Sequence, residues 1–292
     1  MDLVSVVFGI YPKSDELRRA IGKWEKGVLK GKEIAEKIEE ESRLFYDLTK
    51  SAQLDYFTDP LFNWYDIFRP LVLSVDGMRL GPLTRYKETN TFYRMPIIDK
   101  IGKLGEIMEF RDLSENPPLP LYHMNDSDSY LPFLPGINSL IKMSNVSRYL
   151  ENPAEMIKEI YLEILRKLKA NRVLIYEPME TENFSIYDDI IQNVKLFLVT
   201  TGKVNSSALS ANRNRFYSII SDDPYSVSKY CEIPGLKTVN AMNTKIEDDL
   251  LERLKGYSND FDRMIISNNE SFDFLPRRVA DKKILTFRGG VS

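Results

Sequence analysis

The sequence predicts an α/β fold with a parallel sheet, organised as one domain over residues 1–292. Apolar, β-branched runs alternate with amphipathic segments of helical spacing, which is the pattern of repeated β/α units. The chain has 292 residues and 43% of them are hydrophobic, so it can bury a large core without a disulfide or a metal. A barrel and an open doubly wound sheet both fit this pattern. The first strand is not followed by Gly-x-Gly-x-x-Gly, which disfavours a dinucleotide-binding domain.

The first β/α unit lies at the N-terminus. Residues 3–10 are a β-branched apolar run that ends before Pro12, as expected of a buried strand. Ser14 can cap a helix with Asp15 in its first turn, and a second amphipathic stretch extends to Leu48. Residues 76–132 are less regular, and we expect them to hold an excursion such as a hairpin.

The central and C-terminal parts carry further signals of helices and strands. Asn152-Pro153-Ala154-Glu155 predicts the start of a helix, because it offers a cap, a proline at the first helical position and a capping glutamate. Strands are predicted over 172–176, 194–199 and 263–267, with another ending at Val239. Helices are predicted over 244–256, with a capping box at residues 244–247, and over 274–285.

Composition excludes several classes of function. The net charge of -3 gives no basic field that would favour nucleic acid or an anionic membrane. No apolar run is long enough to span a bilayer, and the N-terminus has no basic segment typical of a signal peptide. Cys231 is the single cysteine, which is typical of a reducing compartment. We therefore expect a cytoplasmic protein.

Polar residues follow several predicted strands, where parallel α/β folds place their chemistry. Lys13 can bind a carboxylate or phosphate, although the sequence alone favours a solvated lysine at a helix start. Trp64 and Asp66, with Arg69, could stack and hydrogen-bond a planar ligand, or could begin a helix with Trp64 in the core. We give these two readings equal weight.

Two further candidates lie later in the chain. Arg85, Asn90, Tyr93 and Arg94 belong to a stretch dense in aromatic, basic and amide groups, which is typical of a polar ligand lining and also of an exposed hairpin. Glu177 stands at the end of a predicted strand and is followed by Pro178, which favours a role in binding an amine or hydroxyl over a helix cap.

A zinc site is not predicted. Zinc that activates a thiol needs a ligand set rich in cysteine and histidine, and His123 and Cys231 are the only such residues. They lie far apart in the sequence, so each is better explained as a structural residue. Cys-His nucleophilic chemistry is disfavoured for the same reason, and no residue is assigned a catalytic role.

Several segments, taken in order, resemble cobalamin-independent methionine synthase. Each motif is short, but the series spans nearly the whole chain. The similar segments are Gly9 to Ala20, Lys23 to Gly27, Leu83 to Tyr93, Phe133 to Gly136, Ile175 to Pro178, Ile266 to Asn269 and Phe274 to Arg277.

The resemblance implies a (β/α)8 barrel of the TIM type and a role in methyl transfer to homocysteine from a methyl carrier such as a methylated pterin. The sequence departs from the family where zinc would be bound: residues 200–203, 240–243 and 268–270 supply no thiol or imidazole, and Tyr176 replaces an aspartate. The chain therefore looks like the family's zinc-free N-terminal barrel. It would bind the carrier and act with a separate zinc-bearing catalytic chain, and hold no cofactor itself.

Two other functions remain open. The chain could be a zinc-independent, stand-alone methyltransferase or decarboxylase-like enzyme of the same superfamily, or a non-enzymatic ligand-binding scaffold. Barrels host many chemistries, so the fold does not choose between them.

Overall fold

The computed structural model describes residues 1–89, 91–105, 128–181, 183–202, 204–210 and 215–290. They form two compact units. Unit 1 comprises the described residues within Met1–Tyr65, Met108–Leu131 and Thr238–Ser292, and unit 2 those within Asp66–Ile107 and Pro132–Lys237. The organisation of residues 1–292 as a single domain stays a prediction.

Unit 1 contains a parallel sheet with helices along it. The strand order is β5-β2-β1-β12, and the last residues of β11 follow β12. The strands are β1 (Asp2–Val7), β2 (Tyr56–Thr58), β5 (Tyr130–Leu131), β12 (Arg263–Asn268) and the end of β11 (Cys231–Val239). The helices are α1 (Asp15–Glu25), α2 (Gly31–Ser51), α10 (Leu250–Leu254) and α11 (Arg277–Leu285), with 3-10 turns at Lys255–Tyr257, Phe272–Phe274 and Thr286–Gly290.

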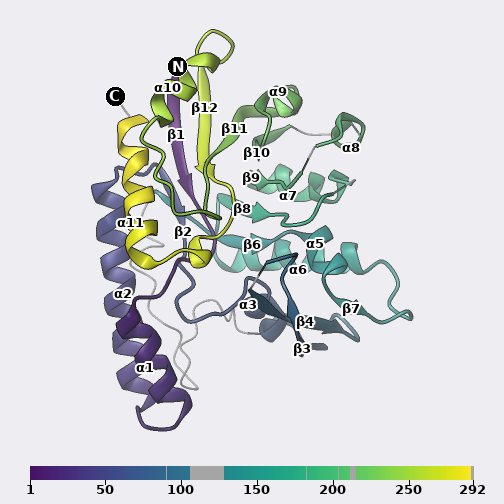
Figure 1. Ribbon diagram of the computed structural model, residues 1–292. Coiled ribbons are helices and arrows are strands. Elements are labelled where there is room, and N and C mark those ends of the chain that lie inside the picture. Colours follow the sequence, from purple (N-terminus) through teal and green to yellow (C-terminus); the bar gives the residue numbers. More distant parts are fainter. Residues whose placement is uncertain (90, 106–127, 182, 203, 211–214, 291–292) are drawn as a thin grey trace. The chain divides into compact units, whose positions relative to one another are not determined.

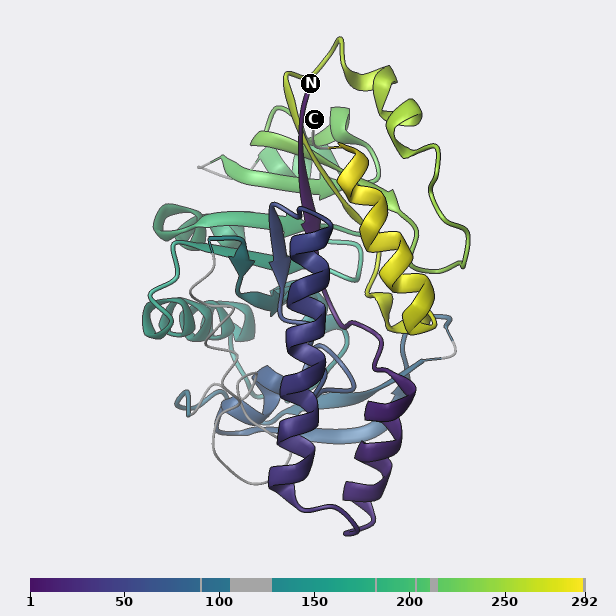
Figure 2. The ribbon, with the colours of Figure 1, turned by 90° about the vertical axis from the view of Figure 1, so that its left-hand side faces the viewer.

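The first and last strands of unit 1 are direct neighbours. Strand β1 pairs in parallel with β12 from Asp2↔Arg263 to Val6↔Ser267 (Figure 1). Helices α2 and α11 run side by side, and α1 packs against α2 (Figure 2). Ser14 caps α1 as expected, since its side chain accepts a hydrogen bond from the backbone N–H of Leu17 at 3.0 Å. Both ends of the chain therefore build one unit.

Unit 2 contains a second run of parallel strands in the order β6-β8-β9-β10-β11. Its strands are β6 (Phe133–Pro135), β8 (Arg172–Tyr176), β9 (Lys195–Val199), β10 (Phe216–Ser221) and the first part of β11. Its helices are α3 (Arg69–Ser74), α5 (Ile137–Lys142), α6 (Pro153–Lys167), α7 (Asp188–Asn193), α8 (Ser206–Ser210) and α9 (Pro224–Val227), with a 3-10 turn at Ser185–Tyr187.

A small separate sheet also belongs to unit 2. Strands β3 (Met78–Arg85) and β4 (Phe92–Ile98) form an antiparallel hairpin, and β7 (Asn145–Val146) pairs in parallel with β4. The excursion expected within 76–132 is therefore confirmed for its first part, as a hairpin. Residues 106–127 lie outside the described part of the chain.

The strand topology defines the fold class. The whole strand order is β5-β2-β1-β12-β11-β10-β9-β8-β6. Its two end strands, β5 and β6, are consecutive in the chain and are separated only by Pro132. Counting β5 and β6 as one interrupted strand gives an eight-membered parallel series, which is the topology of a (β/α)8 barrel. The predicted fold class is confirmed, and this topology differs from that of the open doubly wound sheet.

One predicted helix start is wrong. We expected residues 244–247 to form a capping box, but α10 begins only at Leu250. The Glu247 carboxylate instead accepts hydrogen bonds from the ammonium of Lys283 and from the backbone N–H of Asn240. A partner on the last helix thus replaces the local cap. Within the described residues, no helix is both long and apolar enough to cross a membrane.

Candidate functional site

Three loops at the carboxyl edge of the unit 1 sheet are joined by hydrogen bonds. The backbone N–H of Gly9, after β1, donates to Oγ1 of Thr58 at 3.1 Å, and that of Tyr11 donates to the carbonyl of Pro60 at 2.9 Å. The backbone N–H of Ile10 donates to Oγ of Ser271 at 3.2 Å. The loops after β1, β2 and β12 therefore form one continuous wall.

Gly9 is required at the centre of this wall. Its φ is +85°, and a Cβ at this position would lie 2.4 Å from Oγ of Ser271. Any other residue would strain the backbone and push the third loop away. The wall is therefore closely packed as well as hydrogen-bonded.

Buried polar atoms without a protein partner are concentrated in these loops. Of the five buried side-chain atoms that make no hydrogen bond among the described residues, three lie here: Oδ2 of Asp59, Nε1 of Trp64 and Oδ1 of Asp273. Asp59 is 1% exposed, and its other oxygen accepts from the backbone N–H of Leu61 at 2.6 Å. Asp273 as a residue is only half-buried, although its Oδ1 has no exposed surface. Buried polar atoms of this kind mark positions where a ligand or ordered water binds.

The two aspartates share an unusual electrostatic state. Burial raises the pKa of the Asp59 carboxyl to about 7. Burial, and then the negative charge of Glu270, raise the pKa of Asp273 to about 7, while Lys13 acts in the opposite direction. Carboxyls that titrate near neutral pH at strand ends are candidates for ligand binding or proton transfer.

Lys13 lies beside this group. Its Nζ donates to the backbone carbonyl of Trp64 at 2.7 Å and lies 5.2 Å from the ring centroid of Tyr65. Both contacts hold the ammonium over the loop that follows β2. Lys13 and Trp64, which belong to separate clusters in the sequence, are thus brought together, although Trp64 is 6% exposed and offers its indole N–H rather than an open ring face.

A network of hydrogen bonds and ion pairs connects the loop after β1 to the neighbouring helices. The hydroxyl of Tyr11 donates to Asp281 at 2.6 Å, and Arg277 forms ion pairs with Asp281 at 2.7 Å and with Glu41 at 3.0 Å. The guanidinium also stacks over the Tyr11 ring, 5.0 Å from its centroid. This network ties the loop after β1 to α2 and α11, and so fixes the position of the loop.

In unit 2, Asp66 is fully used as a structural carboxylate. Its Oδ1 accepts from the backbone N–H groups of Phe68 and Arg69, at 3.1 and 3.0 Å. Its Oδ2 accepts from Nε of Arg69 at 2.7 Å and from the backbone N–H of Arg94 at 3.1 Å. The carboxylate therefore fastens the start of α3 to strand β4.

The hairpin residues divide between its two faces. Tyr93 is buried, with its ring near those of Phe68 and Tyr86, and its hydroxyl donates to the carbonyl of Met143 at 2.9 Å. Arg85 and Arg94 are exposed, and the guanidinium of Arg94 donates to the carbonyl of Gly81 at 3.3 Å. Asn90 lies outside the described residues.

The hairpin tip contributes a residue that we did not single out from the sequence. Lys87 has a φ of 51° and lies within 5.2 Å of the Tyr86 ring centroid and 5.9 Å of the Tyr176 ring centroid. Its ammonium also lies 3.5 Å from the Tyr176 hydroxyl. The tip therefore reaches the carboxyl end of β8, and only tertiary structure reveals this.

Glu177, which follows β8, is buried and receives five hydrogen bonds. Oε1 accepts from the backbone and side-chain N–H groups of Asn138, at 3.2 and 2.8 Å, and from the hydroxyl of Tyr187. Oε2 accepts from the backbone N–H of Ser139 at 2.8 Å and from its hydroxyl. The carboxylate fastens the start of α5, and Gly136 allows this approach, since a Cβ there would lie 2.1 Å from Cδ of Glu177. The binding roles of Glu177 and the other predicted residues stay predictions.

The single cysteine, Cys231, lies at the amino end of its strand, whereas the candidate site residues lie at carboxyl ends. Cys231 is the first residue of β11, and its thiol donates to the carbonyl of Val227 at 3.4 Å. Burial raises the pKa of this thiol to about 11. His123 is outside the described residues, and among those that are described no three His, Cys, Asp or Glu side chains are grouped to hold a metal ion.

Sequence reasoning missed Asp59 and Asp273 as well as Lys87. Asp59 directly follows β2 and Asp273 lies within the 3-10 turn Phe272–Phe274, but nothing in the local sequence shows that either carboxyl will be buried. A weak signal was available for Asp59, because an aspartate before proline directly after a β-branched run often begins a loop.

Topology and site together define a (β/α)8-type α/β protein with polar groups at the carboxyl ends of its strands. Among solved structures, it is similar to a B12-independent methionine synthase from a Shewanella species, solved in complex with selenomethionine, with a TM-score of 0.61, 12% sequence identity and coverage of 90% of this chain and 89% of that one. It is also similar to a putative vitamin-B12-independent methionine synthase from Listeria monocytogenes, with a TM-score of 0.65, 11% identity and coverage of 97% and 94%. No protein-family model and no curated protein sequence matches the chain.

Proposed function

We propose that the chain is a methionine synthase-related barrel that takes part in methyl transfer to homocysteine as a zinc-free, carrier-binding component in the cytoplasm. The observation that carries the proposal is the group of buried, unpartnered polar atoms of Asp59, Trp64 and Asp273 in loops at strand carboxyl ends. In (β/α)8 barrels this is the edge where substrates bind. The fold shared with a solved methionine synthase and with a second structure described as a putative one supports this choice of reaction.

The catalytic zinc is proposed to belong to a separate chain. Zinc activates a thiol by binding it as thiolate, and its site needs soft ligands. Cys231 stands at the amino end of β11, opposite the carboxyl edge, and its high pKa keeps it a neutral thiol. After β12 the chain offers Asn269 and Glu270 rather than a cysteine. The partner's zinc would supply homocysteine as thiolate.

The methyl carrier is proposed to be an anionic, methylated pterin. In unit 2, Arg85 and Arg94 are exposed on the hairpin, so each can pair with an anionic group of the carrier. In unit 1, Lys13 is held at the carboxyl edge and is a separate candidate for such a contact. Asp66 and Tyr93 hold strand β4 of the hairpin in place, because Asp66 accepts from the backbone N–H of Arg94 and the Tyr93 hydroxyl donates to the carbonyl of Met143.

Calorimetric titration with 5-methyltetrahydrofolate triglutamate, in the presence of a metal chelator, tests carrier binding. We expect the Arg85→Ala/Arg94→Ala variant to weaken binding by about tenfold or more, because each lost charge-assisted contact contributes roughly 1.5–3 kcal/mol. Arg79→Ala is the matched control, since Arg79 is an exposed arginine of the same hairpin that pairs with Asp99. The proposal fails if the wild-type chain binds no carrier, or if the double variant binds as well as the wild type.

One observation favours a zinc-independent enzyme as a second candidate. Asp59 and Asp273 titrate near pH 7, so either could act as a general acid or base at neutral pH. This alternative requires turnover by the purified chain alone in chelator. Asp59→Asn and Asp273→Asn should then abolish the turnover, whereas turnover only with an added zinc-bearing chain supports the first proposal.

A further inference from the structure

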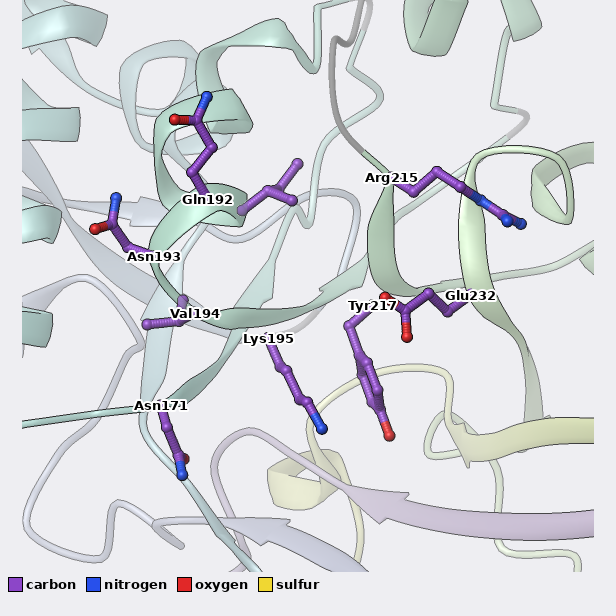
Figure 3. Close-up of a pocket in the computed structure, with 9 residues that line it drawn as sticks. Asn171, Gln192, Asn193, Val194, Lys195, Arg215, Tyr217 and Glu232 are labelled. Atoms are coloured by element: carbon purple, nitrogen blue, oxygen red, sulfur yellow. The ribbon is translucent and has the colours of Figure 1, made fainter.

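Unit 2 contains a depression at the amino ends of its parallel strands. Its volume is about 260 Å³, and seven of its lining residues carry polar groups: Asn171, Gln192, Asn193, Lys195, Arg215, Tyr217 and Glu232 (Figure 3). Asn171 directly precedes β8, whereas Tyr176 ends the same strand. The depression therefore lies at the strand ends opposite to those that carry Tyr176 and Glu177.

The walls of the depression are fixed by contacts within unit 2. The guanidinium of Arg215 donates to the carbonyls of Ser228 and Cys231. The ammonium of Lys195 lies 5.0 Å from the ring centroid of Tyr217, and that ring packs on Phe197 at 4.8 Å between centroids. A ligand would meet groups that are already positioned, which lowers the entropic cost of binding.

Several polar groups of the lining have no competing protein partner. In the part of the chain that the structure describes, no protein group bonds the side chains of Asn171, Gln192 or Glu232. Figure 3 shows Lys195 and Tyr217 side by side, with Glu232 next to Tyr217. The guanidinium of Arg215 is turned away from Lys195 and Tyr217. The ammonium of Lys195, the carboxylate of Glu232 and the amides of Asn171 and Gln192 are thus the lining groups open to a ligand, whereas the Asn193 amide donates to the carbonyl of Asp189.

We propose that this depression binds a small hydroxylated anion, such as a sugar phosphate or a sugar acid. Lys195 would pair with the anionic group, while Glu232 and the amides of Asn171 and Gln192 would hydrogen-bond the hydroxyls. The volume is below the range of roughly 300–1,000 Å³ of pockets for drug-sized ligands, which suits a single sugar unit. The site does not depend on the proposed methyl-transfer function, because it lies at the opposite strand ends.

Calorimetry with glucose 6-phosphate and with gluconate tests the site, with glucose and inorganic phosphate as partial ligands. We expect glucose 6-phosphate, gluconate or both to bind more tightly than glucose or inorganic phosphate. The tighter of the two hydroxylated anions shows whether the site prefers a phosphate or a carboxylate. Lys195→Met should weaken its binding by about tenfold, since a charged hydrogen bond is lost, and Glu232→Gln should weaken it severalfold.

Lys167→Met, which removes an exposed lysine of α6 in the same unit, is the control and should bind as the wild type does. Lys195 is exposed, so its variant should keep the wild-type unfolding midpoint. The proposal is overturned if neither hydroxylated anion binds at millimolar concentration, if phosphate or glucose binds equally well, or if Lys195→Met has no effect. Carrier binding at the carboxyl edge should be unchanged in Lys195→Met, which separates the two sites.

Discussion

The ammonium of Lys283 lies 2.8 and 2.9 Å from the two carboxylate oxygens of Glu247, and the Lys283 side chain has no exposed surface. This ion pair joins α11 to the connection that follows β11. Lys283→Met would leave the Glu247 charge buried without its partner, which typically costs about 3–5 kcal/mol. We expect that loss in the free energy of unfolding measured with urea.

Lys282→Met provides the control for this prediction, because Lys282 is the exposed neighbour on the same helix and its loss should change stability by less than about 0.5 kcal/mol. The double variant Lys283→Met/Glu247→Leu should recover much of the lost stability, since it removes both charges together. Equal effects of Lys282→Met and Lys283→Met would contradict the assignment.

The buried carboxyl of Asp59 should make stability fall as the pH rises. Its pKa is raised to about 7 from 3.8, so the folded state holds a proton that the unfolded state releases between these pH values. The loss of folding stability caused by ionising the buried carboxyl is absent below about pH 4 and complete above about pH 7. Its size is on the order of 4 kcal/mol. Asp59→Asn should therefore gain stability over the wild type from pH 4 to pH 8, as measured by urea unfolding. A parallel pH dependence of the two proteins would refute this.

The five hydrogen bonds of Glu177 predict a structural cost for Glu177→Gln. The amide presents N–H groups to donors that need acceptors, and each buried group left unsatisfied costs about 1–3 kcal/mol. Thermal and urea unfolding should both show a loss of this size. Glu159→Gln, an exposed position on α6, should have no effect. Unchanged stability combined with lost ligand binding would instead assign Glu177 to the ligand.

Cys231 should be inert in the folded protein. It has no exposed surface, and its pKa of about 11 leaves little thiolate at pH 8. We expect iodoacetamide to modify it at least about a hundredfold more slowly than a free cysteine, at a rate that rises with urea as the chain opens. Mass spectrometry measures the labelling rate. Fast labelling of the native chain would contradict this prediction, because it would show that the thiol is accessible.

Periodic patterns predicted the helices and strands that local sequence determines. The strand over 172–176 has the predicted bounds, the strand ending at Val239 ends there, and Ser14 caps the first helix. In these segments, β-branched runs and capping residues agree with the tertiary environment, so propensity and packing favour the same structure. The short strands β2, β5 and β6 have too few residues for any period to appear.

The candidate site was less predictable because its properties arise from contacts that are distant in sequence. The high pKa of Asp59 comes from burial beneath loops that start more than 40 residues away, and Asp273 is held by a backbone bond to Ile10. The failed capping box at 244–247 has the same origin, since Lys283 outcompetes the local backbone for Glu247. Sequence showed which polar groups exist, and only the fold showed which of them lack a partner.

The pairing of β1 with β12 has a consequence for the order of events during protein synthesis. At roughly 5–20 residues per second, a ribosome needs on the order of ten seconds or more to make the chain between these strands. Over that time β1 has one edge without its neighbour, and α2 lacks the helix that packs beside it. Unit 1 is therefore complete only after β12 and α11 have been made, long after β1, and the nascent chain must be protected from association until then.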